Sequence, residues 1–325
     1  KIRIVDSAKP NFEKSSPNTK LIFVLAIFFG VLSGVVFTFV YEFLDSTIKS
    51  IDEIERRGLP VLAIIPSIGS NSSGSKKIKK KGYKLNFKSD KIERRLLTHE
   101  DPKSPISEAY RSLRTSLMYD KQNDDAKLIL VSSPGPGEGK TTTIANLAIT
   151  YANMGRSTLL VDVDLRKPVL HKMFKNNQSK KGLTNFLSGS EENINDIIYD
   201  SGVPNLKLIS SGVVPPNPSE LLASDQMNAF INQARKEFDI ILFDTPPLIA
   251  VTDAFIMTKF VDKFLLVIRA SVTQKGSLAR SLINMNNIDR NIDGVVFNGV
   301  DQSNTYGGGY YYQYQQYYYG SEDES

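Results

Sequence analysis

One segment near the middle of the chain limits the fold more strongly than any other. The apolar run 128–131 leads into the glycine-rich stretch 134–142, and a second apolar run, 144–148, follows at once. This order predicts a strand, a loop and a helix, with backbone N–H groups converging on an anion at the positive end of the helix dipole. Pro134 replaces the first glycine of the phosphate-loop pattern G-x-x-x-x-G-K-[ST]. The predicted nucleotide-phosphate site comprises Gly135, Pro136, Gly137, Glu138, Gly139, Lys140, Thr141 and Thr142.

Two side chains of this loop have a defined chemistry. The Lys140 ammonium is expected to reach the β- and γ-phosphates of a nucleoside triphosphate, and the Thr141 hydroxyl is expected to bind Mg²⁺. ATP and Mg²⁺ are therefore the predicted cofactors. The alternative is a chance glycine-rich turn, against which the flanking strand and helix argue.

Three aspartates follow apolar runs elsewhere in the chain. Asp162 and Asp164 come directly after the run 158–161, and Asp244 ends the run 240–243. Because the carboxyl ends of parallel strands meet at one edge of a sheet, we expect these side chains beside the glycine-rich loop. Asp162 and Asp244 are then expected to hold Mg²⁺, and either Asp162 or Asp164 is expected to accept a substrate proton. The alternative, mainly for Asp164, is that the side chain caps the next helix.

Short apolar runs alternate with polar or amphipathic stretches of helix length from residue 101 onward. This alternation predicts an α/β fold of the P-loop NTPase-like kind, with a mostly parallel sheet flanked by helices and joined by right-handed crossovers. The predicted strands are 128–132, 158–161, 206–209, 240–243, 264–268 and 295–297, with a further short strand at 61–65.

A transmembrane helix is predicted at 21–43. Residues 21–41 carry no charge, and a helix of that length crosses the ~30 Å hydrocarbon core. A buried core helix rarely runs so long without a charge, and no small-residue cleavage site of a signal peptide follows. Basic residues are more numerous after the span than before it, which predicts a cell-membrane location with the C-terminal part in the cytoplasm. Gly30 and Gly34 have a spacing that permits close helix contact in lipid.

The composition excludes several kinds of chemistry. The 325 residues include no cysteine and only two histidines, so disulfides, thiolate sites and histidine-rich metal sites are excluded. A net charge of +5 is only mildly basic, and we expect membrane lipid, and no nucleic acid, as a partner. The lysine-rich run 76–81 either attracts anionic headgroups or forms part of a solvated linker.

With these motifs, the chain resembles the bacterial tyrosine kinases of the polysaccharide co-polymerase type, the BY-kinases, over nearly its whole length. Residues 43–49 and 58–62 resemble the end of the family's membrane activator, and the remainder resembles its cytoplasmic kinase. Gly212 and the stretch 215–222 match a further part of the family pattern. The resemblance implies an ATP-dependent tyrosine autokinase that regulates capsular or exopolysaccharide polymerisation and export. Its implied partners are that machinery and a tyrosine phosphatase.

The resemblance also implies a subunit contact. Glu108, Arg111 and Arg114 match the family's E-x-x-R-x-x-R motif and fall on roughly one face of a helix. In a homo-oligomeric ring, this contact would present one subunit's tail to the next subunit's site at high effective concentration. Without the resemblance, a solvated helix face with local ion pairs is the simpler interpretation.

The segment 301–325 lacks the aliphatic residues of a core, which predicts disorder. The resemblance makes its tyrosine cluster an autophosphorylated tail, and a sticky segment unrelated to catalysis is the alternative. Each phosphate adds a charge of about −1.5 to −2, which is expected to repel neighbouring tails and loosen the ring. The predicted sites are Tyr306, Tyr310, Tyr311, Tyr312, Tyr314, Tyr317, Tyr318 and Tyr319.

Five parts are expected along the chain. They are an extracytoplasmic remnant at 1–20, the transmembrane helix at 21–43, an activator segment and linker at 44–100, the kinase domain at 101–300 and the tail at 301–325. Whether the join near 71–84 is natural stays open. Asn298 is placed near the adenine by its position after the strand 295–297 alone.

Two rival functions remain. A ParA/MinD-like membrane-associated positioning ATPase shares the phosphate loop, both aspartate motifs and the sheet, but the tyrosine tail and the membrane span argue against it. A non-catalytic scaffold is the other, and the intact Lys140, Asp162 and Asp244 argue against that.

Overall fold

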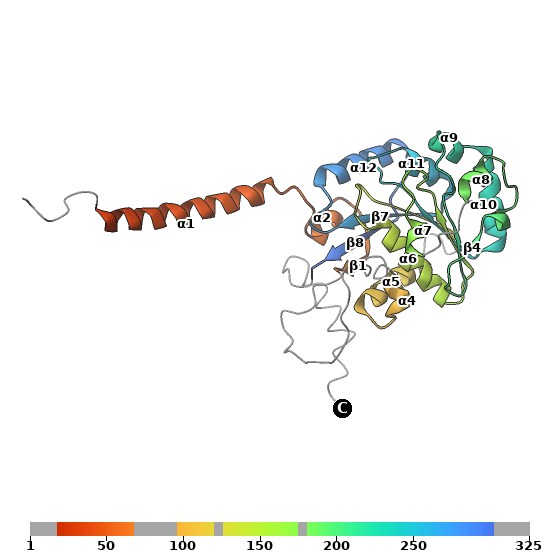
Figure 1. Cartoon of the computed structure of the whole chain (residues 1–325), viewed down its shortest axis with the longest axis horizontal. Helices are drawn as coiled ribbons and strands as arrows, with labels where there is room; N and C mark the ends of the chain where they lie inside the picture. The colour runs from red at the N-terminus through yellow and green to blue at the C-terminus, as the bar shows by residue number, and fades with distance from the viewer. Residues whose placement is uncertain (1–17, 68–95, 120–125, 175–180, 302–325) are drawn as a thin grey trace, which may run out of the picture. The chain divides into compact units, whose positions relative to one another are not determined.

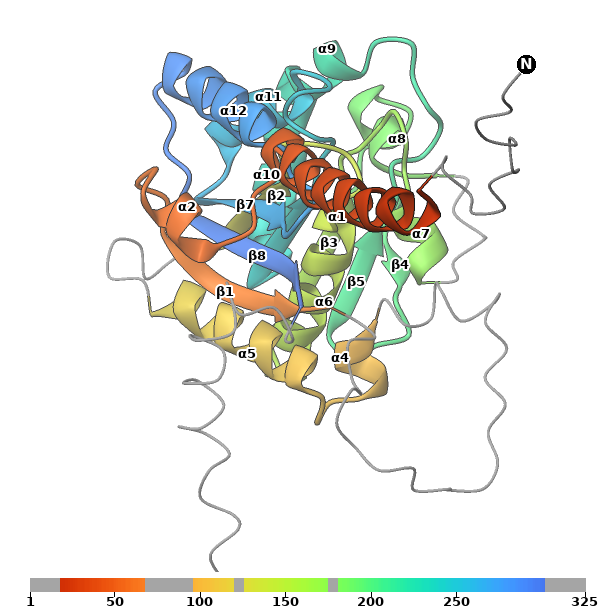
Figure 2. The ribbon, with the colours of Figure 1, turned by 90° about the vertical axis from the view of Figure 1, so that its left-hand side faces the viewer.

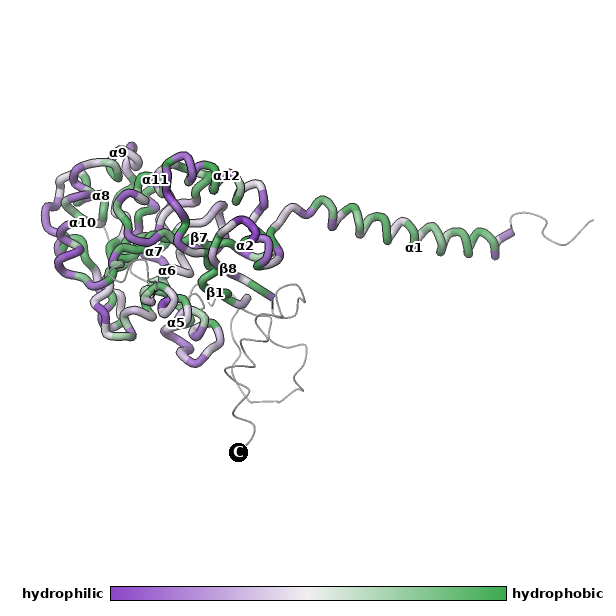
Figure 3. The backbone as a smooth tube through the Cα atoms, turned by 180° about the vertical axis from the view of Figure 1, so that it is seen from behind, coloured by the Kyte–Doolittle hydropathy of each residue, from purple (hydrophilic) through white to green (hydrophobic). Residues whose placement is uncertain are grey.

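The computed structural model describes residues 18–67, 96–119, 126–174 and 181–301, and its two compact units meet between Ser46 and Thr47. The first unit contains one long helix, α1 (Thr19–Leu44), whose side chains are all exposed. Figure 3 shows the apolar character along nearly all of α1. The hydroxyl groups of Ser33 and Thr38 donate to carbonyls of the preceding turn, so they find partners within the helix. By length and composition α1 is able to cross a membrane.

The second unit is built on one eight-stranded sheet in the order β1-β8-β7-β2-β6-β3-β5-β4 (Figures 1 and 2). All neighbouring strands are parallel except β4, which pairs antiparallel with β5. The strands are β1 (Val61–Pro66), β2 (Leu128–Ser132), β3 (Thr158–Asp162), β4 (Tyr199–Asp200), β5 (Leu206–Ile209), β6 (Ile240–Asp244), β7 (Lys263–Arg269) and β8 (Gly294–Val300).

Helices cover both faces of this sheet (Figure 1). They are α2 (Ile51–Glu55), α4 (Leu97–Glu100), α5 (Pro105–Met118), α6 (Lys140–Asn153), α7 (Leu170–Met173), α8 (Leu183–Leu187), α9 (Pro218–Leu222), α10 (Asp225–Glu237), α11 (Asp253–Met257) and α12 (Lys275–Asn287), with 3₁₀ turns at Ile194–Asp196 and Thr258–Phe260.

Alternate residues of each central strand point to opposite faces, and each face has its own core. Leu128 and Leu130 of β2 pack with residues of α8, α10, α11 and α12. Ile129 and Val131 pack on the other face with residues of α5, α6 and α7. Burial on both faces explains why these strands read as continuous apolar runs. The predicted α/β fold with a mostly parallel sheet is confirmed, and the two-residue strand β4 is an addition to the prediction.

The strand β1 joins the sheet as an edge strand beside β8. Val61 pairs with Val295, and the Pro60 carbonyl accepts a hydrogen bond from Val295 N at 2.8 Å. Gly294 leaves the space that the Leu62 side chain occupies. Before β1, the Ile48 backbone exchanges two hydrogen bonds of 2.9 Å with the turn after β7. The stretch from residue 47 to 66 is therefore integrated into the second compact unit.

Candidate nucleotide-binding site

The glycine-rich loop leaves β2 and ends at the first residue of α6. Gly137 and Gly139 have φ values of +77° and +98°, a region that residues with a Cβ rarely adopt. Gly139 is the N-cap of α6, so Lys140 begins the helix. Left-handed glycines in such a turn bring successive N–H groups into one concavity, at the positive end of the α6 dipole. This local geometry is suited to a polyphosphate.

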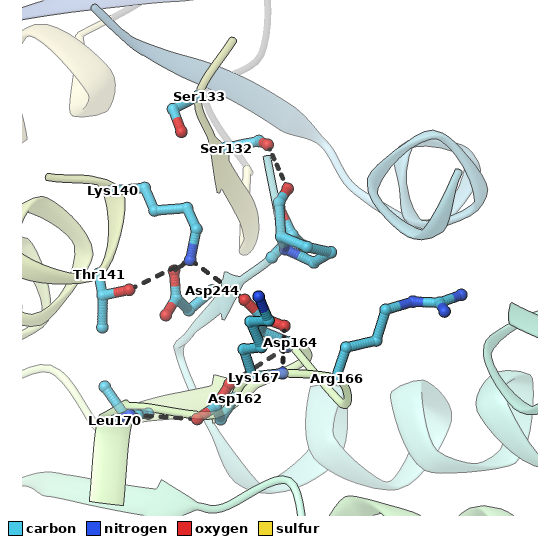
Figure 4. Close-up of polar contacts among 12 residues, drawn as sticks. Ser132, Ser133, Lys140, Thr141, Asp162, Asp164, Arg166, Lys167, Leu170 and Asp244 are labelled. Carbon is cyan, nitrogen blue, oxygen red and sulfur yellow. Dashed lines mark hydrogen bonds and ion pairs between the residues drawn. The ribbon is translucent and has the colours of Figure 1, made fainter. Parts of the chain in front are cut away.

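The Lys140 ammonium lies between two carboxylates (Figure 4). Its Nζ is 3.5 Å from Asp164 Oδ2 and 3.5 Å from Asp244 Oδ1, and it donates a hydrogen bond of 3.3 Å to Thr141 Oγ1. Burial alone would lower the pKa of Lys140, but the attraction of Asp244, Asp164 and Asp162 outweighs it and raises the pKa. Lys140 is therefore a fixed positive charge at the mouth of the loop. The structure thus brings together the lysine and aspartates that the sequence predicts for one site.

Asp162 and Asp164 differ in what they contact. Asp162 is fully buried, and its two carboxylate oxygens accept hydrogen bonds of 3.2 Å from the backbone N–H groups of Asp164 and Leu170. Burial, reinforced by Asp244, raises the pKa of Asp162 to about 8. Asp164 accepts from Lys167 N at 3.0 Å through Oδ1, while Oδ2 faces Lys140. The turn after β3 is thus anchored by Asp162, and Asp164 presents an oxygen to the site.

Asp244 ends β6 and is nearly as deeply buried. Its Oδ1 accepts no hydrogen bond from the described residues, although the Lys140 ammonium faces it. Burial raises the pKa of Asp244 against the opposing charge of Lys140. Within the described residues no preformed cluster of three or more acidic or histidine ligands exists. Mg²⁺ bound to nucleotides usually takes one or two carboxylates, with phosphates and water completing its shell. Asp244 Oδ1, which faces Lys140 without a hydrogen bond, and the Thr141 hydroxyl fit this pattern.

The Glu138 side chain lies under the loop and is only 3 % exposed. Burial raises the pKa of Glu138 to about 7, although hydrogen bonds with the Gly135 backbone, Thr273 and Ser133 oppose the shift. Its Oε2 has no hydrogen-bond partner in the described part of the chain. Glu138 therefore presents its backbone, and not its carboxyl group, to the predicted phosphate site.

Two residues outside the predicted site contact the loop. Arg269 at the end of β7 donates to the Gly137 carbonyl at 3.0 Å, and Asn298 of β8 donates to the Glu138 carbonyl at 2.9 Å. For Asn298, whose proximity to the adenine stays a prediction, the described contact is with the loop. Both residues directly follow predicted strands, and this position at a strand end is the only feature of the sequence that points to a place near the site. The sequence carried no indication that their side chains reach the glycine-rich loop.

A further polar cluster supports the turn after β3. Arg166 donates to both carboxylate oxygens of the fully buried Asp253, at 2.8 and 3.1 Å, and to Ser219 Oγ at 2.9 Å. Ser219 in turn donates to Asp253 at 2.6 Å. This cluster joins the residues beside Asp164 to α9 and α11. Ser219 belongs to the stretch 215–222, so the cluster gives that stretch a structural contact with the site.

The predicted subunit-contact residues lie on α5. Arg111 pairs with Glu108 at 2.8 Å on the exposed side of the helix. Arg114 points to α6 and donates to the Thr150 carbonyl at 2.8 Å. The described contacts of the three residues are thus within the chain, and their role between subunits stays a prediction. The predicted phosphorylation sites and the lysine run 76–81 lie outside the described residues.

Comparisons with known proteins find a matching family model and curated relatives named tyrosine-protein kinases. A family model described as an AAA domain matches residues 126–293. The tyrosine-protein kinase YwqD of Bacillus subtilis is 35 % identical over 209 residues, which cover 64 % of this chain and 87 % of that protein. The tyrosine-protein kinase ptk of Acinetobacter johnsonii is 32 % identical over 303 residues, which cover 93 % of this chain but 40 % of the relative. The chain thus spans about two fifths of the length of the longer curated relatives it matches.

A solved structure agrees in fold. The kinase domain of the Escherichia coli tyrosine kinase ETK superimposes with a TM-score of 0.67 at 28 % identity. The match covers 78 % of this chain and 95 % of that domain. The region matched by the family model, residues 126–293, includes the glycine-rich loop and the three aspartates.

Proposed function

This chain belongs to the bacterial tyrosine-protein kinases, and we propose that it transfers the γ-phosphoryl group of ATP to protein tyrosine. The observation that carries the proposal is the position of the Lys140 ammonium, 3.5 Å from each of two aspartates at the start of α6. A cation, a helix N-terminus and converging amides form the arrangement that stabilises charge on a transferred phosphoryl group. The residues of the site would therefore act mainly by electrostatics and positioning.

Each residue of the loop has a distinct role in this proposal. The backbone N–H groups of residues 137–142 bind the phosphate oxygens; Pro136 has no N–H to donate. Lys140, whose side chain is 14 % exposed, exchanges its carboxylate partners for the β- and γ-phosphates. Thr141, Asp162 and Asp244 would hold Mg²⁺, directly or through water, and the metal neutralises phosphate charge when bound.

We assign the general base to Asp164. Both oxygens of Asp162 are already used by backbone N–H groups, whereas Asp164 Oδ2 faces Lys140 and accepts no backbone hydrogen bond. A substrate tyrosine has an unperturbed pKa of about 10, so its hydroxyl needs an acceptor near neutral pH. Asp164 orients that hydroxyl and takes its proton as the phosphoryl group arrives.

The acceptors we propose are the tyrosines of the tail at 301–325. Transfer takes place between neighbouring subunits of a homo-oligomeric ring at the cell membrane, with α1 as the anchor. The exposed Glu108 and the half-buried Arg111 of α5 contribute to the subunit contact. Accumulated phosphate loosens the ring, which regulates capsular or exopolysaccharide polymerisation and export, and a tyrosine phosphatase reverses the modification.

The test is mass spectrometry of the tail after the purified full chain, in detergent, is incubated with ATP and Mg²⁺. Wild-type protein should gain phosphotyrosine, and Lys140→Met should lose at least roughly 100-fold of the rate. Lys236→Met, which removes an exposed lysine of α10, should behave as wild type. Phosphotyrosine in purified Lys140→Met protein would refute the assignment. Release of free phosphate without phosphotyrosine in wild type would favour a positioning ATPase instead.

A further inference from the structure

We propose that Arg269 and Asn298 are positioning residues that fix two peptide planes of the glycine-rich loop before nucleotide binds. They hold the carbonyls of Gly137 and Glu138 towards β7 and β8. The N–H groups of Glu138 and Gly139 then point to the phosphates. The inference rests on the proposed nucleotide binding, and it does not depend on transfer to tyrosine.

The two side chains start from neighbouring places in the sheet. Arg269 and Asn298 are register partners at the carboxyl ends of β7 and β8, and Ala270 N donates to the Asn298 carbonyl at 2.9 Å. The Arg269 stem lies beside Gly299, where a Cβ would meet it at the ordinary contact distance of 3.4 Å and where φ is +71°. Parallel strands thus deliver both donors to the edge of the sheet where the loop lies.

Each donor binds one carbonyl of consecutive peptide units. Arg269 Nη1 donates to the Gly137 carbonyl at 3.0 Å, and Asn298 Nδ2 donates to the Glu138 carbonyl at 2.9 Å. In a trans peptide the carbonyl and the following N–H point in opposite directions. Binding the two carbonyls therefore directs the N–H groups of Glu138 and Gly139 away from β7 and β8, towards the phosphate side of the loop.

The loop needs such support because its glycines permit the opposite orientation. Gly137 and Gly139 both have positive φ, and glycine adopts positive and negative φ about equally. A flipped peptide would aim a carbonyl oxygen at the phosphates and repel them. Asn298 also fills the place where a Cβ on Gly139 would lie, so the amide packs directly against the loop backbone.

Removal of either donor is expected to weaken nucleotide binding roughly 3- to 10-fold, the range of one hydrogen bond. The variants are Asn298→Ala, Arg269→Met and Arg269→Lys, in the full chain in detergent. Exposed residues distant from the loop give matched controls, Asn287→Ala and Arg156→Met. The dissociation constants of ADP and of inorganic tripolyphosphate are measured by calorimetry, and thermal unfolding checks that each variant is folded.

The base-free ligand separates loop positioning from base recognition. We expect Asn298→Ala to weaken both ligands by the same factor, and a loss confined to ADP would overturn the inference in favour of an adenine contact. Arg269→Met should weaken both ligands at 0.5 M salt, where distant charges are screened, and Arg269→Lys should recover part of the affinity. A loss that vanishes in salt would overturn the role of Arg269. If wild type binds neither ligand, the proposed function itself fails.

Discussion

Arg166 donates two hydrogen bonds to the buried carboxylate of Asp253, from Nε to Oδ2 at 2.8 Å and from Nη2 to Oδ1 at 3.1 Å. Arg166 follows Asp164 by two residues, and Asp253 is the first residue of α11. A paired, planar contact of this kind restricts the backbone from which it starts. The position of the proposed general base thus depends on a residue that never contacts substrate.

We predict that Asp253→Asn lowers the rate of tyrosine phosphorylation roughly 10- to 100-fold, because small displacements of a reacting group are costly. The affinity for ADP should change much less, since the loop itself is untouched. Single-turnover phosphorylation and ADP calorimetry measure the two effects. Ser219→Ala, which keeps the ion pair, is the matched control and should lose less. An unchanged rate in Asp253→Asn would contradict the prediction.

Glu138 makes the stability of the folded domain depend on pH. Its pKa is about 7 in the folded protein and 4.5 as the ordinary value, so between these limits the folded state retains a proton that the unfolded state has released. Stability from this group is fully present below pH 4.5 and is lost as pH rises through 7. Glu138→Gln mimics the protonated side chain. The variant should therefore not lose the folding stability of about 3 kcal/mol that wild type loses as pH rises.

Denaturant unfolding of wild type and Glu138→Gln at pH 5 and pH 8 measures this effect. The stability difference between the two proteins should shift in favour of the variant at pH 8. Glu192→Gln alters an exposed carboxyl and should show no such shift. A pH-independent difference for Glu138→Gln would show that the Glu138 carboxyl is ionised throughout.

Tyr110 is predicted to stay unphosphorylated while the protein is folded. Its side chain is 2 % exposed between α5 and α6, and burial raises its pKa to about 12. Tyr119, at the end of the same helix, is 77 % exposed and provides an internal comparison. Peptide mapping after ATP treatment should find no phosphate on Tyr110, and Tyr110→Phe should leave total phosphotyrosine unchanged. A phosphorylated Tyr110 peptide from folded protein would contradict this.

We predict that adding a methyl group at Gly294 of β8 weakens the packing of the edge strand β1 and lowers the stability of the domain. A Cβ at Gly294 would collide with the Leu62 side chain, so Gly294→Ala should cost about 1–3 kcal/mol of stability. Leu62→Ala alone removes apolar contact, yet in combination with Gly294→Ala it should relieve the collision. A double-mutant cycle of unfolding free energies measures the coupling, which is expected to be favourable. Strict additivity would contradict the pairing of β1 with β8.

The strands of the sheet could be predicted from the sequence because they are buried on both faces and read as apolar runs. The strand β4 could not, since Tyr199 and Asp200 form a two-residue edge without an apolar pattern. Its pairing depends on β5, which supplies the backbone partners.

The site was predictable where chemistry is carried by a local motif. Lys140 and Asp244 belong to such motifs, and the topology of parallel strands explains why they meet. The contacts of Arg269 and Asn298 with the loop connect distant parts of the chain, and no local pattern encodes them. Helical spacing placed Arg114 on a face of α5, but it could not distinguish a neighbouring subunit from the Thr150 carbonyl of α6.

The pairing of β1 with β8 has a consequence for biosynthesis. Val61 leaves the ribosome roughly 10 to 50 s before Val295, its strand partner, at ordinary translation rates. During that interval the apolar segment 61–66 has no edge to join, so it is available to chaperones and to incorrect strand partners. The edge of the sheet is therefore completed only after Val295 has emerged, although its last strand, β1, is synthesised long before.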